Sequence, residues 1–297
     1  MAIRIYRKRY DKAFRRMLTQ EFGTPQDFSL SDDDIINGGK FVHKNQLFLG
    51  VYPVSQIEHM FEKHKVREFF DKKGIHNISW HINMNDPFVH RFILLSENNG
   101  IKHKLIELVL QKKILKLPLD KNKDVNLEFL LVEWLMMQNP YKAFSDKRRA
   151  LPGQKAPGLG IGLHMLEVLH QLAEKTHTHG LINSPNYLHT AIFFSRYFRF
   201  LDPKIEAFIQ VVKKELIPPF KLFRVSWADE YGALQHKRTS RPVSWRPSTM
   251  IYPITPEAKR YFNSRDYRLQ VRKAREKLKL QVNMKKLTKK LSEHAQI

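Results

Sequence analysis

The 297-residue chain contains no cysteine. This excludes a disulfide framework, a cysteine-ligated zinc site and a thiol nucleophile. Long apolar runs are also missing, because the best one, residues 129–137, is interrupted by Glu133 and falls short of the ~20 residues of a membrane span. The basic N-terminus is followed by no apolar segment, which argues against a secretory signal. We therefore expect a cytoplasmic protein that is not integral to a membrane.

Acidic residues are few relative to basic ones. The chain has 29 Asp and Glu against 52 Lys and Arg, a formal net charge of +23. Such a field attracts polyanions, so nucleic acid, an anionic surface or an acidic cofactor fits, although the same charge also fits a merely well-solvated surface. The basic residues gather at the two ends, in residues 4–16, which have helical apolar spacing, and in residues 266–297.

Glycine is sparse too, with 12 residues, yet three of them fall close together at Gly158, Gly160 and Gly162. They lie between an apolar run, residues 127–137, and an amphipathic segment, residues 163–175. This order predicts a strand, a glycine-rich turn and a helix N-terminus, where backbone N–H groups bind anions. A phosphorylated cofactor is the expected ligand, and a connection without a ligand is the alternative.

Other motifs with known chemistry are absent. The glycine stretch lacks the Gly-Lys-Ser/Thr ending of a phosphate-binding P-loop and the spacing of a dinucleotide fingerprint. Five histidines gather within 26 residues, but no carboxylate or cysteine completes a metal-binding pattern, so we expect no metal. These histidines are His164, His170, His177, His179 and His189.

The order of elements expected over residues 127–200 is strand, glycine loop, helix, short strand, helix and aromatic strand. It resembles the acyl-CoA-binding half of the GNAT superfamily of N-acetyltransferases, over about a quarter of the chain. The family's loop reads (Gln/Arg)-x-x-Gly-x-(Gly/Ala), and residues 155–160 fit its spacing, with Lys155 in first place and Gln154 one residue too far. In the family's second landmark, Ala191 and Phe200 keep their spacing, but Leu188 and Ser195 replace the usual Asn and Tyr.

The resemblance implies a mixed α/β (α+β) fold whose central mixed sheet has a strand that splays from its neighbour. It implies acetyl-CoA or another acyl-CoA as the cofactor, held by the glycine loop and the end of the central strand. The residues expected to bind it are Leu135, Met136, Met137, Gln154, Lys155, Gly158, Leu159, Gly160, Ile161, Gly162 and Asn186.

Direct acyl transfer needs an acid for the leaving thiolate and a base for the amine. The resemblance implies Tyr197 as the acid, with Ser195 as a poorer choice. The possible bases are Glu128 and Glu133, which have opposite parity, so at most one faces a given side of the sheet. Each Glu is also consistent with an ordinary ion-paired strand residue.

We expect four regions in the chain. Residues 1–100 form an α+β region with a basic first helix, and residues 101–217 form the acyl-CoA-binding core. Residues 218–264 form a cap rich in Trp, Arg and Pro, and residues 265–297 form a basic helix.

The predicted function is acyl-CoA-dependent N-acyl transfer, with acetyl as the expected group, to an unidentified amine. The alternatives are a non-catalytic nucleic-acid-binding protein that uses the basic termini, and a related fold that binds a ligand without turnover.

Overall fold

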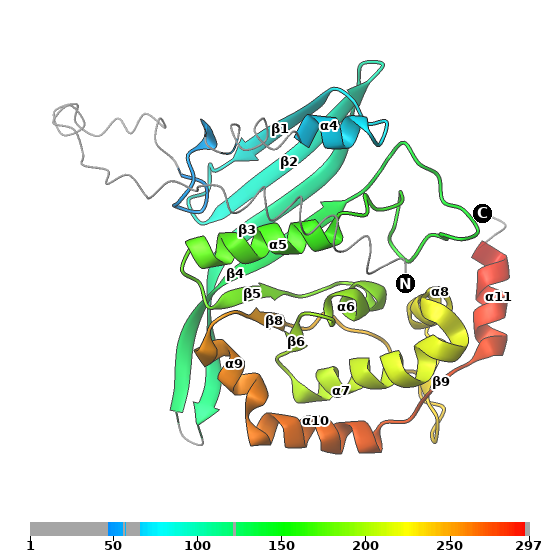
Figure 1. Cartoon of the computed structure of the whole chain (residues 1–297). Coiled ribbons are helices and arrows are strands. Elements are labelled where there is room, and N and C mark those ends of the chain that lie inside the picture. The colour runs from blue at the N-terminus through cyan, green and yellow to red at the C-terminus, as the bar shows by residue number, and fades with distance from the viewer. Residues whose placement is uncertain (1–46, 56, 58–65, 121–122, 295–297) are drawn as a thin grey trace.

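A seven-stranded mixed sheet organises the molecule, as the computed structural model in Figure 1 shows. The structure describes residues 47–55, 57, 66–120 and 123–294, so the expected basic first helix lies outside the described residues. The strand order is β1-β2-β3-β4-β5-β8-β6, which confirms the mixed α/β class. The strands are β1 (Ile78–Asn83), β2 (Val89–Asn98), β3 (Ile101–Asp120), β4 (Lys123–Met137), β5 (Gly180–Asn183), β6 (Arg199–Phe200) and β8 (Met250–Pro253).

Strands β1 to β4 form an antiparallel meander, and β5 then pairs with β4 in parallel. Strand β8 enters between β5 and β6 and is antiparallel to both. A second, two-stranded sheet pairs β7 (Leu234–His236) with β9 (Leu280–Val282). The parallel β4–β5 pair requires a crossover, which helix α5 supplies.

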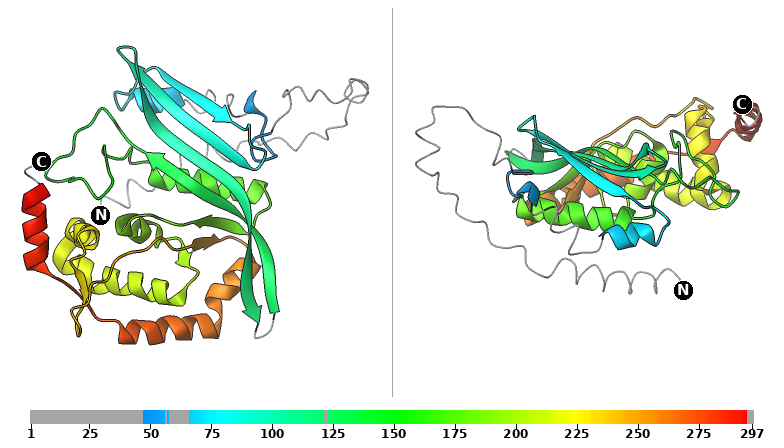
Figure 2. Two further views of the ribbon diagram at one scale, coloured as in Figure 1. Left: turned by 180° about the vertical axis from the view of Figure 1, so that it is seen from behind. Right: turned by 90° about the horizontal axis from the view of Figure 1, so that it is seen from above.

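Helices cover both faces of the sheet (Figures 1 and 2). Residues Leu108 and Leu110 of β3 pack in the same core cluster as Leu169 and Ala173 of α5. Because side chains alternate along a strand, Leu115 and Leu117 face the other side, where α9 and α10 pack. The helices are α4 (Val66–Asp71), α5 (Gly162–Lys175), α6 (Leu188–Phe194), α7 (Pro203–Val211), α8 (Ile217–Glu230), α9 (Pro256–Asn263), α10 (Arg265–Lys277) and α11 (Met284–His294), with a π-helical turn η1 (Val212–Leu216) between α7 and α8.

Residues 217–230 are helical, although the sequence predicts that Pro218 and Pro219 end a helix there. These prolines lie in the first turn of α8, where a missing N–H costs no intrahelical hydrogen bond. The chain changes direction at Lys221, whose φ is 64°. The segment expected to be an irregular cap therefore contributes a helix, and it also supplies β8 to the main sheet.

The C-terminal residues form two helices where the sequence predicts one. Helices α10 and α11 are separated by β9, which pairs with β7. The side chains of Leu280 and Leu287 are buried in the main core cluster. The basic C-terminal segment is therefore packed against the body of the molecule, as Figure 1 shows.

Candidate functional site

Strands β4 and β5 pair over a short stretch only, and the ribbons run in different directions beyond it (Figure 1). Their register contains the pairs Leu130↔Leu181 and Leu131↔Ile182. Strand β5 ends at Asn183, whereas β4 continues through residues 132–137 with no partner on β5 among the described residues. A bulge lies where the strands part, because Val132 and Trp134 pair with consecutive β3 residues and Glu133 is the extra residue between them. One backbone edge of β4 is therefore open beyond Leu131.

The glycine-rich turn lies beyond the end of β4 and is anchored by alternate side chains. Leu159 and Ile161 are buried in the cluster under α4 and β2. The backbone N–H of Asn139 donates to the carbonyl oxygen of Pro157 at 2.6 Å, which ties the strand end to the turn. A Cβ on Gly158 would lie 3.4 Å from the carbonyl oxygen of Met137.

The glycine side of the turn is open. Gly160 has a φ of +78°, and a Cβ at this position would meet no heavy atom within 4 Å. A Cβ on Gly162 would lie 3.5 Å from the ring of Phe193, which is itself largely exposed. No side chain fills the space beside Gly160, so the backbone here is open to close approach.

The turn leads directly into the N-terminus of α5. Its N-cap is Ile161, which makes no side-chain capping hydrogen bond, and its first turn holds no acidic residue. An uncapped helix start presents backbone N–H donors and the positive end of the helix dipole. Together with the open glycines it forms a surface suited to a phosphate group.

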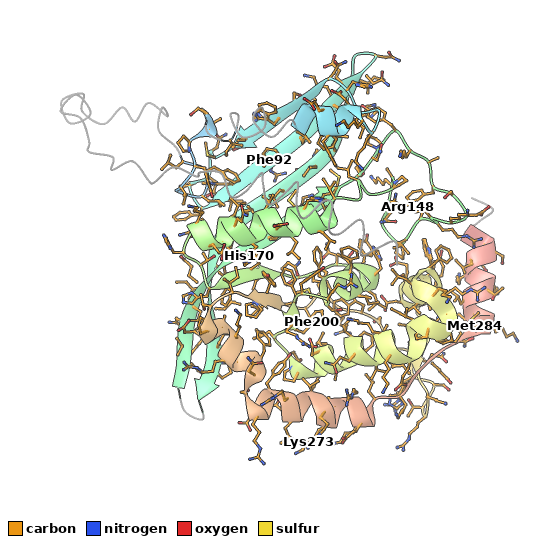
Figure 3. The ribbon with its side chains drawn as sticks, in the orientation of Figure 1. Phe92, Arg148, His170, Phe200, Lys273 and Met284 are labelled. Atoms are coloured by element: carbon orange, nitrogen blue, oxygen red, sulfur yellow. The ribbon has the colours of Figure 1, made fainter. Side chains whose placement is uncertain are left out.

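An arginine that the sequence pattern did not single out supports this surface. The Nη2 atom of Arg148 donates to the carbonyl oxygen of Gly158 at 2.9 Å. Its side chain is exposed and belongs to the loop of residues 138–161 (Figure 3). The GNAT loop pattern has no position for an arginine ten residues before Gly158. Only the fold of the loop brings Arg148 to the turn.

The same loop crosses to the β5 side of the opening. The indole Nε1 of Trp227 on α8 donates to the carbonyl oxygen of Ala150 at 3.0 Å. The ring of Tyr187 lies against Gly153, where an added Cβ would collide with the phenol group. The loop therefore contacts both sides of the parted strands.

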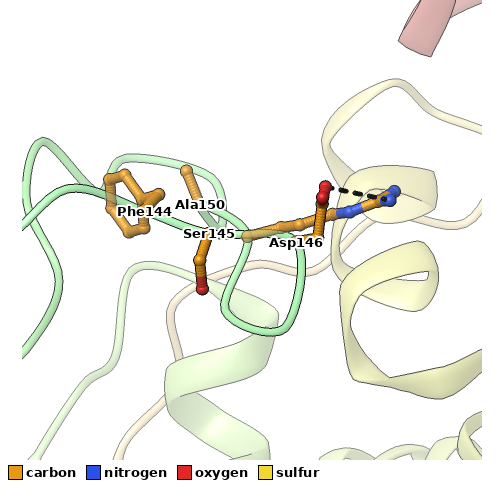
Figure 4. Close-up of a pocket in the computed structure, with 5 residues that line it drawn as sticks. Phe144, Ser145, Asp146 and Ala150 are labelled. Carbon is orange, nitrogen blue, oxygen red and sulfur yellow. Dashed lines mark ion pairs between the residues drawn. The ribbon is translucent and has the colours of Figure 1, made fainter.

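A shallow hollow of about 510 Å³ is formed by this loop (Figure 4). It is wide open to solvent, and Arg149 and Asp146 form an ion pair across it at 3.7 Å. The hollow belongs to the loop and not to the space between β4 and β5. We therefore place the candidate site at the parted strands and the glycine-rich turn. The hollow is lined by Phe144, Ser145, Asp146, Arg149 and Ala150.

Two buried polar atoms without partners follow the point where the strands part. The Oδ1 of Asn183 and the Nδ1 of His189 have no hydrogen-bond partner among the described residues, and their side chains are only 7% and 9% exposed. Burial lowers the pKa of His189 to about 4, so the ring is neutral at pH 7. Because buried polar groups are normally paired, these atoms call for an explanation such as a ligand or a bound water.

The predicted cofactor residues have different surroundings. Gln154 accepts a hydrogen bond from the N–H of Leu151 at 3.0 Å and so closes its own turn, while Lys155 is exposed. Asn186 is exposed in the β5–α6 connection, three residues after the buried Asn183. Leu135, Met136 and Met137 are partly buried on the open part of β4.

The predicted bases lie on opposite faces of β4. Glu128 forms an ion pair with Lys112 at 3.4 Å. Glu133 accepts a hydrogen bond from Nε2 of Gln111 at 2.9 Å. Gln111 pairs with Leu131, so Glu133 lies on the same face of the sheet as Leu131. Glu128 lies on the other face, together with Leu130. Of the two carboxylates, only Glu133 lies beyond the point where the strands part.

The predicted acids lie at the end of α6. Tyr197 is partly buried against the main core cluster. The hydroxyl of Ser195 donates to the carbonyl oxygen of Ile192 at 2.8 Å and accepts from Nζ of Lys213 at 3.1 Å. Burial lowers the pKa of Lys213, with Arg199 and Arg196 acting in the same direction and Glu206 opposing them. No hydrogen bond links either acid to Glu128 or Glu133 in the part of the chain that the structure describes.

Within the described ranges, no group of three or more His, Cys, Asp and Glu side chains could hold a metal ion. Nor is any helix there both long and apolar enough to cross a membrane. Comparison of the chain with protein-family models, curated proteins and solved structures finds no match.

Proposed function

We propose that the protein is an acyl-CoA-dependent N-acyltransferase. The observation that supports this best is the parting of β4 from β5 beside an open glycine-rich turn and an uncapped helix start. The GNAT resemblance implies a splayed strand and a cofactor-binding loop, and the open edge of β4 and the glycine-rich turn support the proposal because they follow that chain order. The observed order β4, loop, α5, β5, α6, β6 agrees with it throughout.

In this proposal the diphosphate of CoA binds the backbone N–H groups from Gly160 to the first turn of α5. The guanidinium of Arg148, held on the carbonyl oxygen of Gly158, supplies positive charge beside it. The pantetheine arm then lies along the open edge of β4, whose unpaired backbone groups can bond its amides. Asn183 offers a buried acceptor oxygen at the same opening.

The reaction is a direct transfer. The amine nitrogen attacks the thioester carbonyl carbon, a new C–N bond replaces the C–S bond, the nitrogen loses a proton and the thiolate gains one. Glu133 is our choice of base, because of the two strand carboxylates it is the one beyond Leu131. Tyr197 remains the proposed acid, and the alternative is Ser195, whose hydroxyl is bonded to Lys213. Positioning and a preorganised backbone supply most of the expected acceleration.

A thermal-shift measurement with CoA tests the binding part of the proposal. Ligand at 100 times its dissociation constant stabilises a protein by about 2.7 kcal/mol, so the melting temperature should rise by several degrees. Gly160→Glu should abolish this shift, because a carboxylate would fill the open space and repel the diphosphate. Gly100→Glu is the matched control, because Gly100 has a φ of +75° and equally open surroundings in the β2–β3 turn. Equal shifts in both variants, or none in the wild type, would refute the proposal.

Turnover is tested by release of free thiol from acetyl-CoA in the presence of a panel of amines. We expect Tyr197→Phe and Glu133→Gln to lower kcat by about 10²- to 10⁴-fold, the usual contribution of general acid–base groups. The CoA-dependent thermal shift should be unchanged in both variants. A shift without turnover for any amine would mean that the fold binds CoA without catalysing transfer.

A further inference from the structure

Helix α10 carries a row of four arginines on its exposed side. At 3.6 residues per turn they fall within about 80° of the helix circumference and span about 15 Å along its axis. All four side chains are exposed, and none forms an ion pair among the described residues. The helix as a whole has six basic residues against two acidic ones, a net charge of +4. The arginine row consists of Arg265, Arg268, Arg272 and Arg275.

The side of α10 next to the arginine row fixes the helix to the body of the protein. Tyr267 and Val271 are buried in the cluster beneath the sheet, and the phenol of Tyr267 donates to the carbonyl oxygen of Phe200 at 2.7 Å. The helix N-cap is Ser264, whose hydroxyl accepts from the N–H of Tyr267. Lys273, on the exposed side, points away from the molecule in Figure 3. The arginine row is thus presented on a rigid support.

We propose that the arginine row is a docking surface for the phosphate backbone of double-stranded DNA. Arginine forms bidentate hydrogen bonds with phosphate, and unpaired arginines in a line match a line of phosphates. The row of about 15 Å slightly exceeds the ~12 Å width of the B-form major groove, so its end residues can reach phosphates on both strands. This surface is independent of the acyl-transfer proposal.

Other polyanions fit the helix less well. Membrane-surface helices insert an exposed apolar face, whereas the apolar face of α10 is buried. Single-stranded nucleic acid is bound by stacking bases on exposed aromatic rings. The aromatic residues of α9 and α10 are buried in the core cluster, so they offer no stacking surface; they are Tyr261, Phe262 and Tyr267.

The test measures binding of a 20-base-pair DNA duplex by fluorescence anisotropy between 50 and 200 mM salt. Replacing all four arginines of the row by Gln should reduce the slope of log K against log salt by about 3 to 4, since each phosphate contact contributes about 0.9. Over this salt range the wild type should lose on the order of 100-fold more affinity than the variant. Gln is a good helix former, so α10 should be retained, which circular dichroism will verify.

The matched control removes four exposed lysines elsewhere, Lys72, Lys102, Lys142 and Lys147, by substitution with Gln. It changes the net charge equally and should leave the slope within about one unit of the wild type. Three outcomes would overturn the proposal. These are equal slopes in the two variants, equal affinity for single-stranded DNA of the same sequence, and binding to phosphatidylserine vesicles that depends on the same arginines.

Discussion

At the scale of single residues, the buried His189 and the partly buried Asp229 titrate in opposite senses. Burial lowers the pKa of His189 to about 4 from its ordinary 6.5. Burial raises the pKa of Asp229 to about 6 from 3.8, although a hydrogen bond from the N–H of Trp245 opposes the rise. Trp245 also donates to the carbonyl oxygen of Pro185 at 3.0 Å, which ties Asp229 to the connection before α6, the helix that carries His189.

These shifts predict opposing contributions to stability in mildly acidic solution. His189 binds fewer protons in the folded state, so its contribution is complete above pH 6.5 and is lost as the pH falls toward 4. Asp229 binds more protons when folded, so its contribution is complete below pH 3.8 and is lost as the pH rises through 6. Each amounts to roughly 3 kcal/mol at most, and the two nearly cancel.

Single substitutions should therefore expose each contribution. Relative to the wild type, the free energy of unfolding of Asp229→Asn should rise between pH 4 and 6.5, because only the His189 contribution remains. That of His189→Gln should fall over the same interval. Urea denaturation at pH 4.5, 5.5 and 6.5 measures both trends. Parallel curves for the wild type and the two variants would show that these groups do not titrate as the structure implies.

At the scale of elements, one of the contacts that hold the loop of residues 138–161 is especially close. Gly153 has a φ of +75°, and any Cβ there would collide with Tyr187. Gly153→Ala should release the loop from α6, so trypsin should cleave faster at Lys147, Arg148, Arg149 or Lys155. The added Tyr187→Ala substitution should restore the slow rate, because it removes the ring that collides.

Gly160→Ala is the comparison variant for this prediction. It imposes a similar left-handed backbone strain, of order 1–3 kcal/mol, but its surroundings are open. We expect its cleavage rate to stay close to that of the wild type. If Gly160→Ala and Gly153→Ala were cleaved equally fast, backbone strain and not the collision with Tyr187 would govern the loop.

The order of elements over residues 127–200 followed from the sequence because each has a strong local signal. Apolar continuity predicted β4, and apolar spacing after a glycine turn predicted α5. The apolar spacing of residues 101–117 alone suits either a helix or a strand. The reason is that β3 buries one face at Leu110 and the other face at Leu115. The sequence does not distinguish the π-helical turn and the bend at Lys221 from the end of a helix.

At the scale of the whole molecule, the candidate site was predicted only in part. The glycine turn was recognisable because glycines and a helix start leave a local pattern. The place of Arg148 and the burial of Asn183 and His189 were not predicted, because they depend on where the loop folds and which atoms become buried. Asn186, which the sequence analysis expects to bind the cofactor, is exposed. Asn183, three residues earlier, is buried.

The C-terminal segment belongs to the same core as the sheet, and this can be tested by mutation. Leu287 of α11 is completely buried, and Val282 of β9 packs in the cluster that also holds Leu130 of β4. Strand β9 is fixed by its pairing with β7 and by the hydrogen bond from the N–H of Asn283 to the carbonyl oxygen of Ala233 at 2.8 Å. Removing this segment would therefore open the main core.

Leu287→Ala should lower the free energy of unfolding by about 2–5 kcal/mol, the cost of deleting a fully buried leucine side chain. Lys285→Ala, on the exposed side of the same helix, should change it by no more than about 0.5 kcal/mol. Urea denaturation followed by tryptophan fluorescence measures both. A cooperative transition in which Leu287→Ala costs no more than Lys285→Ala would show that α11 is an appendage, and truncation of the tail would then be a valid test of polyanion binding. The burial of Leu287 predicts instead that such a truncation unfolds the protein.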